Sequence, residues 1–256
     1  MIDEYRAQRA QTYTEQLFKQ KTRLAEAERK LAEKPTKTAA EDARKATKQI
    51  EDRLRWLADL RRTEPQADDS RIFPDWFAPV MVVEDGQRQV KPMRYHCLPA
   101  GSPGSYDEQF PGTFNARRDS LGKFWRRVFG VTHGVALWSG FFENVPRHRA
   151  EGRELRAGER SENVRLEFRP DNGEQMLVAC LWSRWTAPGQ PDLLSFAAVT
   201  DEPPPEVAAA GHDRCIIPIK PQHVEAWLNP DPKNLEAMQA ILDDRERPYY
   251  EHRLAA

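Results

Sequence analysis

Hydrophobic positions repeat with a helical period through the first quarter of this chain. Leu17, Leu24 and Leu31 recur every seven residues, with Tyr13 and Ala27 three residues after the same heptad position. This spacing predicts one long helix, and Pro35 predicts its end.

A second helix is expected directly after that break. Thr38 and Glu41 have the Thr-x-x-Glu spacing of a capping box, which marks a helix start. Apolar residues then recur at helical spacing at Ala43, Ala46, Ile50, Leu57 and Leu60. The sequence therefore predicts an N-terminal helical hairpin. Its thin apolar seam fits either an arm that binds a protein partner or a solvated hairpin that holds only itself together.

Beyond residue 70 the hydrophobic residues no longer recur at helical spacing and instead form short apolar runs typical of β-strands. The run Pro79–Val83, the turn Asp85-Gly86 and the run Val90–Tyr95 predict a β-hairpin. Further strands are expected at 134–138, 164–168, 176–182, 193–199 and 215–219, and helices at 120–129, 204–210, 222–228 and 232–243. Because no strand-helix-strand rhythm persists, the predicted class is α+β, with a curved, mostly antiparallel sheet and peripheral helices.

Composition supports a division of the chain at the same place. Of the 20 prolines only Pro35 precedes residue 65, and all 13 glycines lie at Gly86 or later. We therefore expect three parts: a helical arm (1–64), a linker (65–70) and a folded domain (71–256).

Charge and cysteine content exclude several classes of protein. The net charge of -1 means that nucleic-acid binding would need a local basic patch. Three widely spaced cysteines and the lack of Cys-x-x-Cys or His-x-x-x-His argue against a disulfide framework and a zinc site, so no metal or cofactor is predicted. No run approaches the roughly 20 apolar residues of a membrane helix. With no signal peptide at Met1–Arg6, the prediction is a cytoplasmic protein without membrane contact.

One segment, 114–127, combines basic and aromatic residues. It contains five Lys or Arg residues, one acid and three aromatic residues. Such a surface suits single-stranded nucleic acid, because guanidinium groups neutralise phosphates and rings stack on bases. The alternative is an amphipathic helix whose rings lie in the core and whose arginines face water.

Two further places carry candidate chemistry. Glu143 follows an apolar strand and two aromatic residues, where partial desolvation would suit a carboxylate to proton transfer. His212 lies between a helix end and an apolar strand, beside Asp213 and Arg214, which suits a general acid or base. Each has a structural alternative: a salt-bridged glutamate at a strand end and a structural histidine. Cys215 is a candidate nucleophile, although it opens an apolar run and fits a packed hydrophobe.

These signals occur together in one order, and residues 72–227 resemble the SOS response-associated peptidase family of abasic-site processing proteins. The family's Asn-Ala-Arg motif matches residues 115–117, and its Gly-Phe-Tyr-Glu-Trp motif is similar to residues 140–144. Its His-Asp-Arg motif matches residues 212–214, with Ile-Pro at 217–218. Its Arg-Trp-Gly-Leu-Ile-Pro stretch corresponds to residues 94–99.

The resemblance implies a function and a set of site residues. In the family, an N-terminal cysteine attacks the opened sugar of an abasic site in single-stranded DNA, and its amine and thiol close a thiazolidine. By resemblance, Asn115 would position the sugar, Glu143 would assist proton transfer, and His212 would move protons at the sugar. The DNA-binding residues implied are Arg94, Arg117, Arg118, Arg126, Arg127 and Arg214.

Position 2 departs from the family. It is Ile2 instead of cysteine, and the arm precedes the matching motifs. We therefore expect either a natural start further upstream with Met-Cys, or a catalytically inactive DNA-binding or scaffold protein whose arm recruits a partner. The resemblance implies the DNA-damage (SOS) response, covalent DNA crosslinking at abasic sites, lyase-like chemistry and self-processing peptidase activity, without a cofactor.

Overall fold

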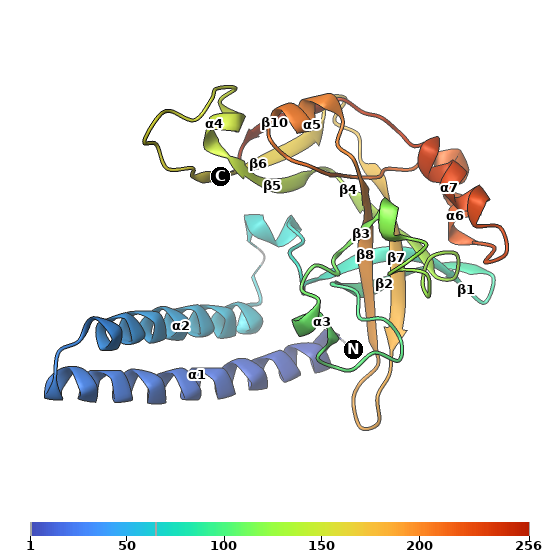
Figure 1. The fold of residues 1–256 in the computed structure, drawn as a ribbon. Coiled ribbons are helices and arrows are strands. Elements are labelled where there is room, and N and C mark those ends of the chain that lie inside the picture. Colours follow the sequence, from blue (N-terminus) through green and yellow to red (C-terminus); the bar gives the residue numbers. More distant parts are fainter. Residues whose placement is uncertain (1, 65, 256) are drawn as a thin grey trace. The chain divides into compact units, whose positions relative to one another are not determined.

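The computed structural model describes residues 2–64 and 66–255 (Figure 1). The chain forms two compact units, Met1–Arg71 and Ile72–Ala256, and each buries its own apolar side chains. Among the described residues, no helix is both long and apolar enough to cross a membrane.

The first unit is a hairpin of two helices, α1 (Ile2–Glu33) and α2 (Lys37–Arg61). Thr36 caps α2, because its backbone is extended and its side chain accepts a hydrogen bond from the Ala39 N–H at 3.2 Å. The predicted capping box at Thr38 is therefore wrong. The cap must be the last extended residue before the helix, and Thr38 already lies in the first turn.

Small residues make up much of the seam between α1 and α2. Its buried side chains are Leu17, Ala27, Ala39, Ala46 and Leu57. The ring of Tyr13 packs against Trp56 with centroids 5.1 Å apart. Phe18 and Leu54 remain 65% and 50% exposed. The seam thus joins the two helices, and a protein partner for the arm stays a prediction.

The second unit is built around a closed, curved sheet. Within the described residues this sheet has seven strands, and β2 pairs with both β1 and β8, which closes the path β2-β1-β4-β7-β8. Most neighbours are antiparallel, while β2 and β3 run parallel to β8. The strands are β1 (Phe77–Glu84), β2 (Gln87–Tyr95), β3 (Asn115–Arg117), β4 (His133–Trp138), β7 (Met176–Trp185), β8 (Leu193–Asp201) and β9 (Cys215–Ile216).

A second, three-stranded sheet in the order β10-β6-β5 packs against this barrel. Its strands are β5 (Phe141–Pro146), β6 (Asn163–Pro170) and β10 (Tyr250–Leu254). The chain passes from the barrel to this sheet through Ser139 and Gly140, between β4 and β5. A Cβ at Gly140 would lie 2.6 Å from the Phe168 carbonyl oxygen, so the two sheets meet where only glycine fits.

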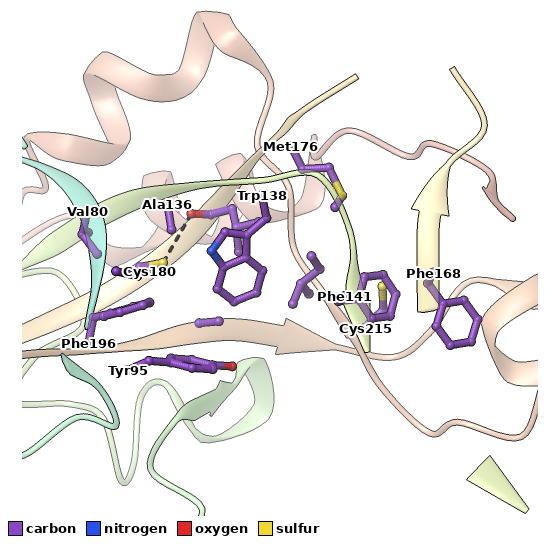
Figure 2. Packing of buried hydrophobic residues seen from close by; sticks show 14 of the residues in the cluster. Val80, Tyr95, Ala136, Trp138, Phe141, Phe168, Met176, Cys180, Phe196 and Cys215 are labelled. Atoms are coloured by element: carbon purple, nitrogen blue, oxygen red, sulfur yellow. Dashed lines mark hydrogen bonds between the residues drawn. The ribbon is translucent and has the colours of Figure 1, made fainter. Parts of the chain in front are cut away.

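Two apolar cores lie on opposite faces of the barrel strands. The inter-sheet core contains Val80, Tyr95, Trp138 and Phe196 from the barrel and Phe141 and Phe168 from the small sheet (Figure 2). The outer core packs barrel strands against α6 (Val224–Leu228) and α7 (Leu235–Asp243). The remaining short helices are α3 (Tyr106–Gln109), α4 (Arg147–Ala150) and α5 (Pro205–Ala209).

The predicted α+β class with a helical hairpin is confirmed, but the helix expected at 120–129 is wrong. A 3-10 turn, Arg118–Ser120, leads into irregular turns. The Trp125 N–H bonds to the Ser120 carbonyl, five residues back, so the regular helical ladder does not propagate. Leu121, Trp125 and Val128 are nevertheless buried, which explains the helical spacing.

Three strands, β3, β5 and β10, were not predicted from the sequence. β3 has only three residues, too few for an alternating pattern. β5 carries Glu143 and Asn144 in its middle, which interrupts its apolar run. β10 is an edge strand in which only Tyr250 is buried. Each depends on pairing with a distant strand, which local periodicity does not report.

His133, at the start of β4, generates a prediction about acid stability. The Gly130 N–H donates to its Nε2 at 2.8 Å, its Nδ1 donates to the Trp227 carbonyl at 3.1 Å, and its ring packs on Trp227. Burial lowers the pKa of His133 to about 3, although the bond to the Trp227 carbonyl opposes that shift. The folded protein therefore holds this ring neutral.

Unfolded chains bind a proton at histidine near pH 6.5, so stability is present above that pH and is lost as the pH falls towards 3. We expect His133 to remove about 2 kcal/mol of stability between pH 7 and pH 5. His133→Gln keeps a donor and an acceptor but does not titrate, so it should flatten the pH dependence by about that amount. Denaturant unfolding at both pH values measures this, and equal slopes in both proteins would contradict it.

Candidate functional site

Glu143 and His212 contact each other directly. Glu143 lies on β5, and its Oε2 is 2.9 Å from Nε2 of His212. The Nδ1 of His212 lies 2.8 Å from the Arg214 carbonyl, a shorter contact than the 3.4 Å to the Arg214 N–H. Both ring nitrogens thus face acceptors, which favours the doubly protonated ring. Burial lowers the pKa of His212, but the bonds to Glu143 and the Arg214 carbonyl outweigh burial and raise it.

Local backbone geometry fixes His212 in this position. Gly211, just before it, has φ +98°, and a Cβ there would meet the Arg149 side chain at 2.7 Å. The His212 N–H bonds to the carbonyl of Val207 in α5. Only glycine therefore allows the sharp turn that brings His212 to Glu143.

Asn115 begins β3 and is held by the barrel. β3 pairs with β8 in parallel, with Asn115 opposite Ala198. The Tyr95 hydroxyl lies 3.3 Å from Asn115 Oδ1. Burial raises the pKa of Tyr95, and the negative charge of Glu143 contributes to the same shift. Tyr95 therefore joins Asn115 to the inter-sheet core.

The six arginines suggested by the sequence have different surroundings. Arg94 is buried and lies 2.8 Å from Asp107. Arg118 contacts Asp201 at 3.3 Å and Asp243 at 2.6 Å. The other four reach solvent: Arg126 and Arg127 are exposed, and Arg117 and Arg214 are partly exposed beside Asp119 and Asp213.

An aromatic cluster lies near the exposed arginines. The rings of Tyr106, Phe110 and Phe124 have centroid separations from 4.6 to 6.4 Å. Phe110 and Phe124 are 43% and 45% exposed. Arg127 is close enough to Tyr106 to act on its pKa, which burial raises and the arginine lowers. The sequence analysis missed Tyr106 and Phe110, because the loop that carries them has no periodic pattern.

Asp75, His96 and Asp107 form the one group of potential metal ligands among the described residues, with ligand atoms within 4.8 Å of one another. Arg94 lies 2.8 Å from Asp107 and 3.8 Å from Asp75, and Nδ1 of His96 lies 3.1 Å from Asp75. The guanidinium supplies the positive charge that the carboxylates need. This group therefore ties the 99–113 loop to β2 and is not a metal centre by its chemistry.

The three cysteines are buried and unpaired by disulfides. Burial raises the pKa of Cys97 and of Cys215 to about 12. Because the thiolate is the nucleophile, both sulfurs are unreactive near neutral pH. This argues against a hydrolase that uses Cys215.

Arg118 and Arg126 make a matched pair for a stability test. Arg118→Ala removes a cation that contacts two carboxylates. One of them, Asp201, has a side chain that is only 19% exposed, and its negative charge would lose one of the positive charges that balance it. We expect a loss of about 2 kcal/mol in the free energy of unfolding. Arg126→Ala, on the surface, should change it by less than about 0.5 kcal/mol. Urea unfolding compares them, and equal values would contradict the structural role of Arg118.

The Glu143–His212 contact predicts a titration. The pKa of His212 should lie above its ordinary value in the wild type, and Glu143→Gln should lower it because the carboxylate charge is removed. The His212 contribution to stability is present below pH 6.5 and is lost as the pH rises through its folded pKa. NMR titration of the ring protons measures the shift. His133 should stay neutral in both proteins. An unchanged pKa of His212 in Glu143→Gln would contradict the contact between Glu143 and His212.

Comparisons with known proteins identify the family of this chain. The family profile described as SOS response associated peptidase (SRAP) matches residues 35–254. No curated protein sequence matches at a significant level.

Three solved structures share the fold at low sequence identity. A protein from Bordetella bronchiseptica is similar with a TM-score of 0.55 and 15% identity, covering 72% of this chain and 86% of its own. A protein from Bacteroides thetaiotaomicron has a TM-score of 0.53 and 14% identity, and the match covers 78% of this chain and 86% of that protein. A phage-related protein from Bordetella bronchiseptica has a TM-score of 0.51 and 18% identity, and the match covers 72% of this chain and 80% of that protein. At these identities the likeness shows the fold alone. The family match over most of the chain shows that this protein belongs to the SOS response associated peptidase family.

Proposed function

We propose that this protein acts on abasic sites in single-stranded DNA, with Asn115, Glu143 and His212 as its catalytic residues. Membership of the family supports a role in DNA-damage-associated abasic-site processing in general. The observation that carries the finer proposal is the 2.9 Å contact between Glu143 and His212. A carboxylate and an imidazole in contact suit proton transfer to and from an opened sugar.

The chemistry assigns each group a task. An amine that attacks the sugar aldehyde must lose water to become an imine, and the departing oxygen needs a proton. The protonated ring of His212 can supply that proton, and Glu143 stabilises the ring's charge. When a thiol then adds to the imine carbon, the thiol proton moves to the nitrogen, a transfer that Glu143 would assist. Asn115 would hold the sugar by hydrogen bonds.

The proposed DNA-binding surface consists of Arg117, Arg126, Arg127 and Arg214. Arg94 and Arg118 are excluded, since carboxylates within the fold engage their guanidinium groups. The exposed rings of Phe110 and Phe124, near Arg127, offer faces on which unstacked bases can pack.

The covalent step needs a cysteine with a free α-amine. The cysteines of the printed sequence are Cys97, Cys180 and Cys215, all internal and buried, and position 2 is Ile2. The printed chain should therefore bind abasic DNA without forming a heat-stable crosslink. For a chain whose only thiols were these three buried ones, the second candidate function is a non-catalytic DNA-binding or scaffold protein whose arm recruits a partner.

The test compares an abasic oligonucleotide with an intact one. We expect wild-type protein to bind both and to prefer the abasic strand. Substituting Arg126 and Arg127 by Ala should weaken both complexes and lower the slope of log K against log salt by about 0.7 per lost phosphate contact. Asn115→Ala should remove only the preference for the abasic strand. Fluorescence anisotropy measures the binding, and a denaturing gel detects any covalent product.

Arg160→Ala, on an exposed arginine outside the proposed surface, is the matched control. An equal loss of binding in this variant would contradict the assigned surface. Binding without preference in wild type would favour the scaffold function. A crosslink that survives denaturation would show that a residue of the printed chain is the nucleophile.

A further inference from the structure

The ring of Tyr95 is locked inside the inter-sheet core. It stacks on Phe196 with centroids 5.0 Å apart, and it meets Trp138 and Phe114 edge to face at 5.7 and 5.9 Å (Figure 2). Its backbone is also fixed, because its N–H bonds to the Trp76 carbonyl and its own carbonyl accepts from Asp75. The position of the hydroxyl is therefore set by packing on several separate segments.

That hydroxyl faces the side-chain oxygen of Asn115 at 3.3 Å. Burial, together with the nearby charge of Glu143, raises the pKa of Tyr95, so the phenol keeps its proton near neutral pH. A buried O–H must find an acceptor, and the amide oxygen is the acceptor within reach. The amide of Asn115 is thus oriented with its oxygen towards Tyr95 and its NH2 group away from it.

The free side of Asn115 is consequently a hydrogen-bond donor. Within residues 2–64 and 66–255, its Nδ2 has no hydrogen-bond partner. A ligand that meets this group must offer an acceptor. Sugar and phosphate oxygens do so, whereas an amino group on a base does not.

We propose that Tyr95 is a positioning residue that fixes Asn115 with its NH2 group towards the ligand, so that the site selects an oxygen acceptor of the sugar that the missing base exposes at an abasic site. This inference rests on the proposed function. It makes recognition of the abasic sugar depend on the hydrogen bond between the Tyr95 hydroxyl and Asn115 Oδ1. It also places the second residue of the Arg-Tyr-His stretch in the site, although Tyr95 does not touch the reacting atoms.

Tyr95→Phe removes the hydroxyl and keeps the ring in its packing. We expect affinity for an abasic oligonucleotide to fall about 3- to 10-fold, as for one lost hydrogen bond, with affinity for an intact strand unchanged. Tyr250→Phe is the matched control. It deletes another buried hydroxyl of the same core, one that contacts Met176 Sδ at 3.4 Å instead of Asn115. Tyr250→Phe should leave the preference for the abasic over the intact oligonucleotide unchanged.

A double-mutant cycle separates positioning from packing. In the Asn115→Ala background, Tyr95→Phe should have no further effect on binding, because the group that it positions is gone. If the hydroxyl only stabilised the core, the loss would be the same in both backgrounds. The same loss in both backgrounds, or no loss in either, would overturn the proposal.

A measurement without DNA distinguishes failure of this inference from failure of the proposed function. The side-chain NH2 signals of Asn115 in an NMR spectrum of the full chain should shift in Tyr95→Phe and stay in place in Tyr250→Phe. If wild-type protein does not bind abasic DNA but this shift occurs, the proposed function fails while the positioning of Asn115 stands. Unmoved amide signals in Tyr95→Phe would overturn the positioning itself.

Discussion

The structure depends on one constraint: a barrel and a small sheet share a single apolar core. The chain passes from one sheet to the other at Gly140, where the Phe168 carbonyl lies 2.6 Å from the position of a Cβ. This close approach lets Phe141 and Phe168 stack, with ring centroids 5.0 Å apart, against the barrel side chains. Without it, the inner face of the small sheet would be exposed to water.

The polar groups of the candidate site lie at the edge of this shared core. Glu143 is two residues after Phe141, Asn115 directly precedes the buried Ala116, and His212 lies three residues before the buried Cys215. Each of the three side chains is only partly accessible to solvent. Partial burial strengthens the electrostatic contact between Glu143 and His212, since less water screens it. The core thus both positions the groups and strengthens their interaction.

The same fold separates arginines with internal partners from arginines that face solvent. Arg118 is held by Asp201 at the end of β8 and by Asp243 at the end of α7, two segments that are far apart in sequence. Arg126 and Arg127 lie in turns that bury Leu121, Trp125 and Val128, and their own side chains face water. An arginine-rich segment therefore contains both structural and surface groups, and the distant acids decide which is which.

The sequence by itself determined the helical hairpin, the β1–β2 hairpin with its Asp85-Gly86 turn, and most of the strands of the barrel. These features depend on local periodicity and turn chemistry, which a single segment carries within its own residues. Its motifs also singled out Asn115, Glu143 and His212. Only the tertiary structure decided that Glu143 and His212 touch, that Tyr95 bonds to Asn115, and that residues 121–130 form turns instead of a helix. Strand pairing and packing between distant segments set those outcomes, and no local pattern reports them.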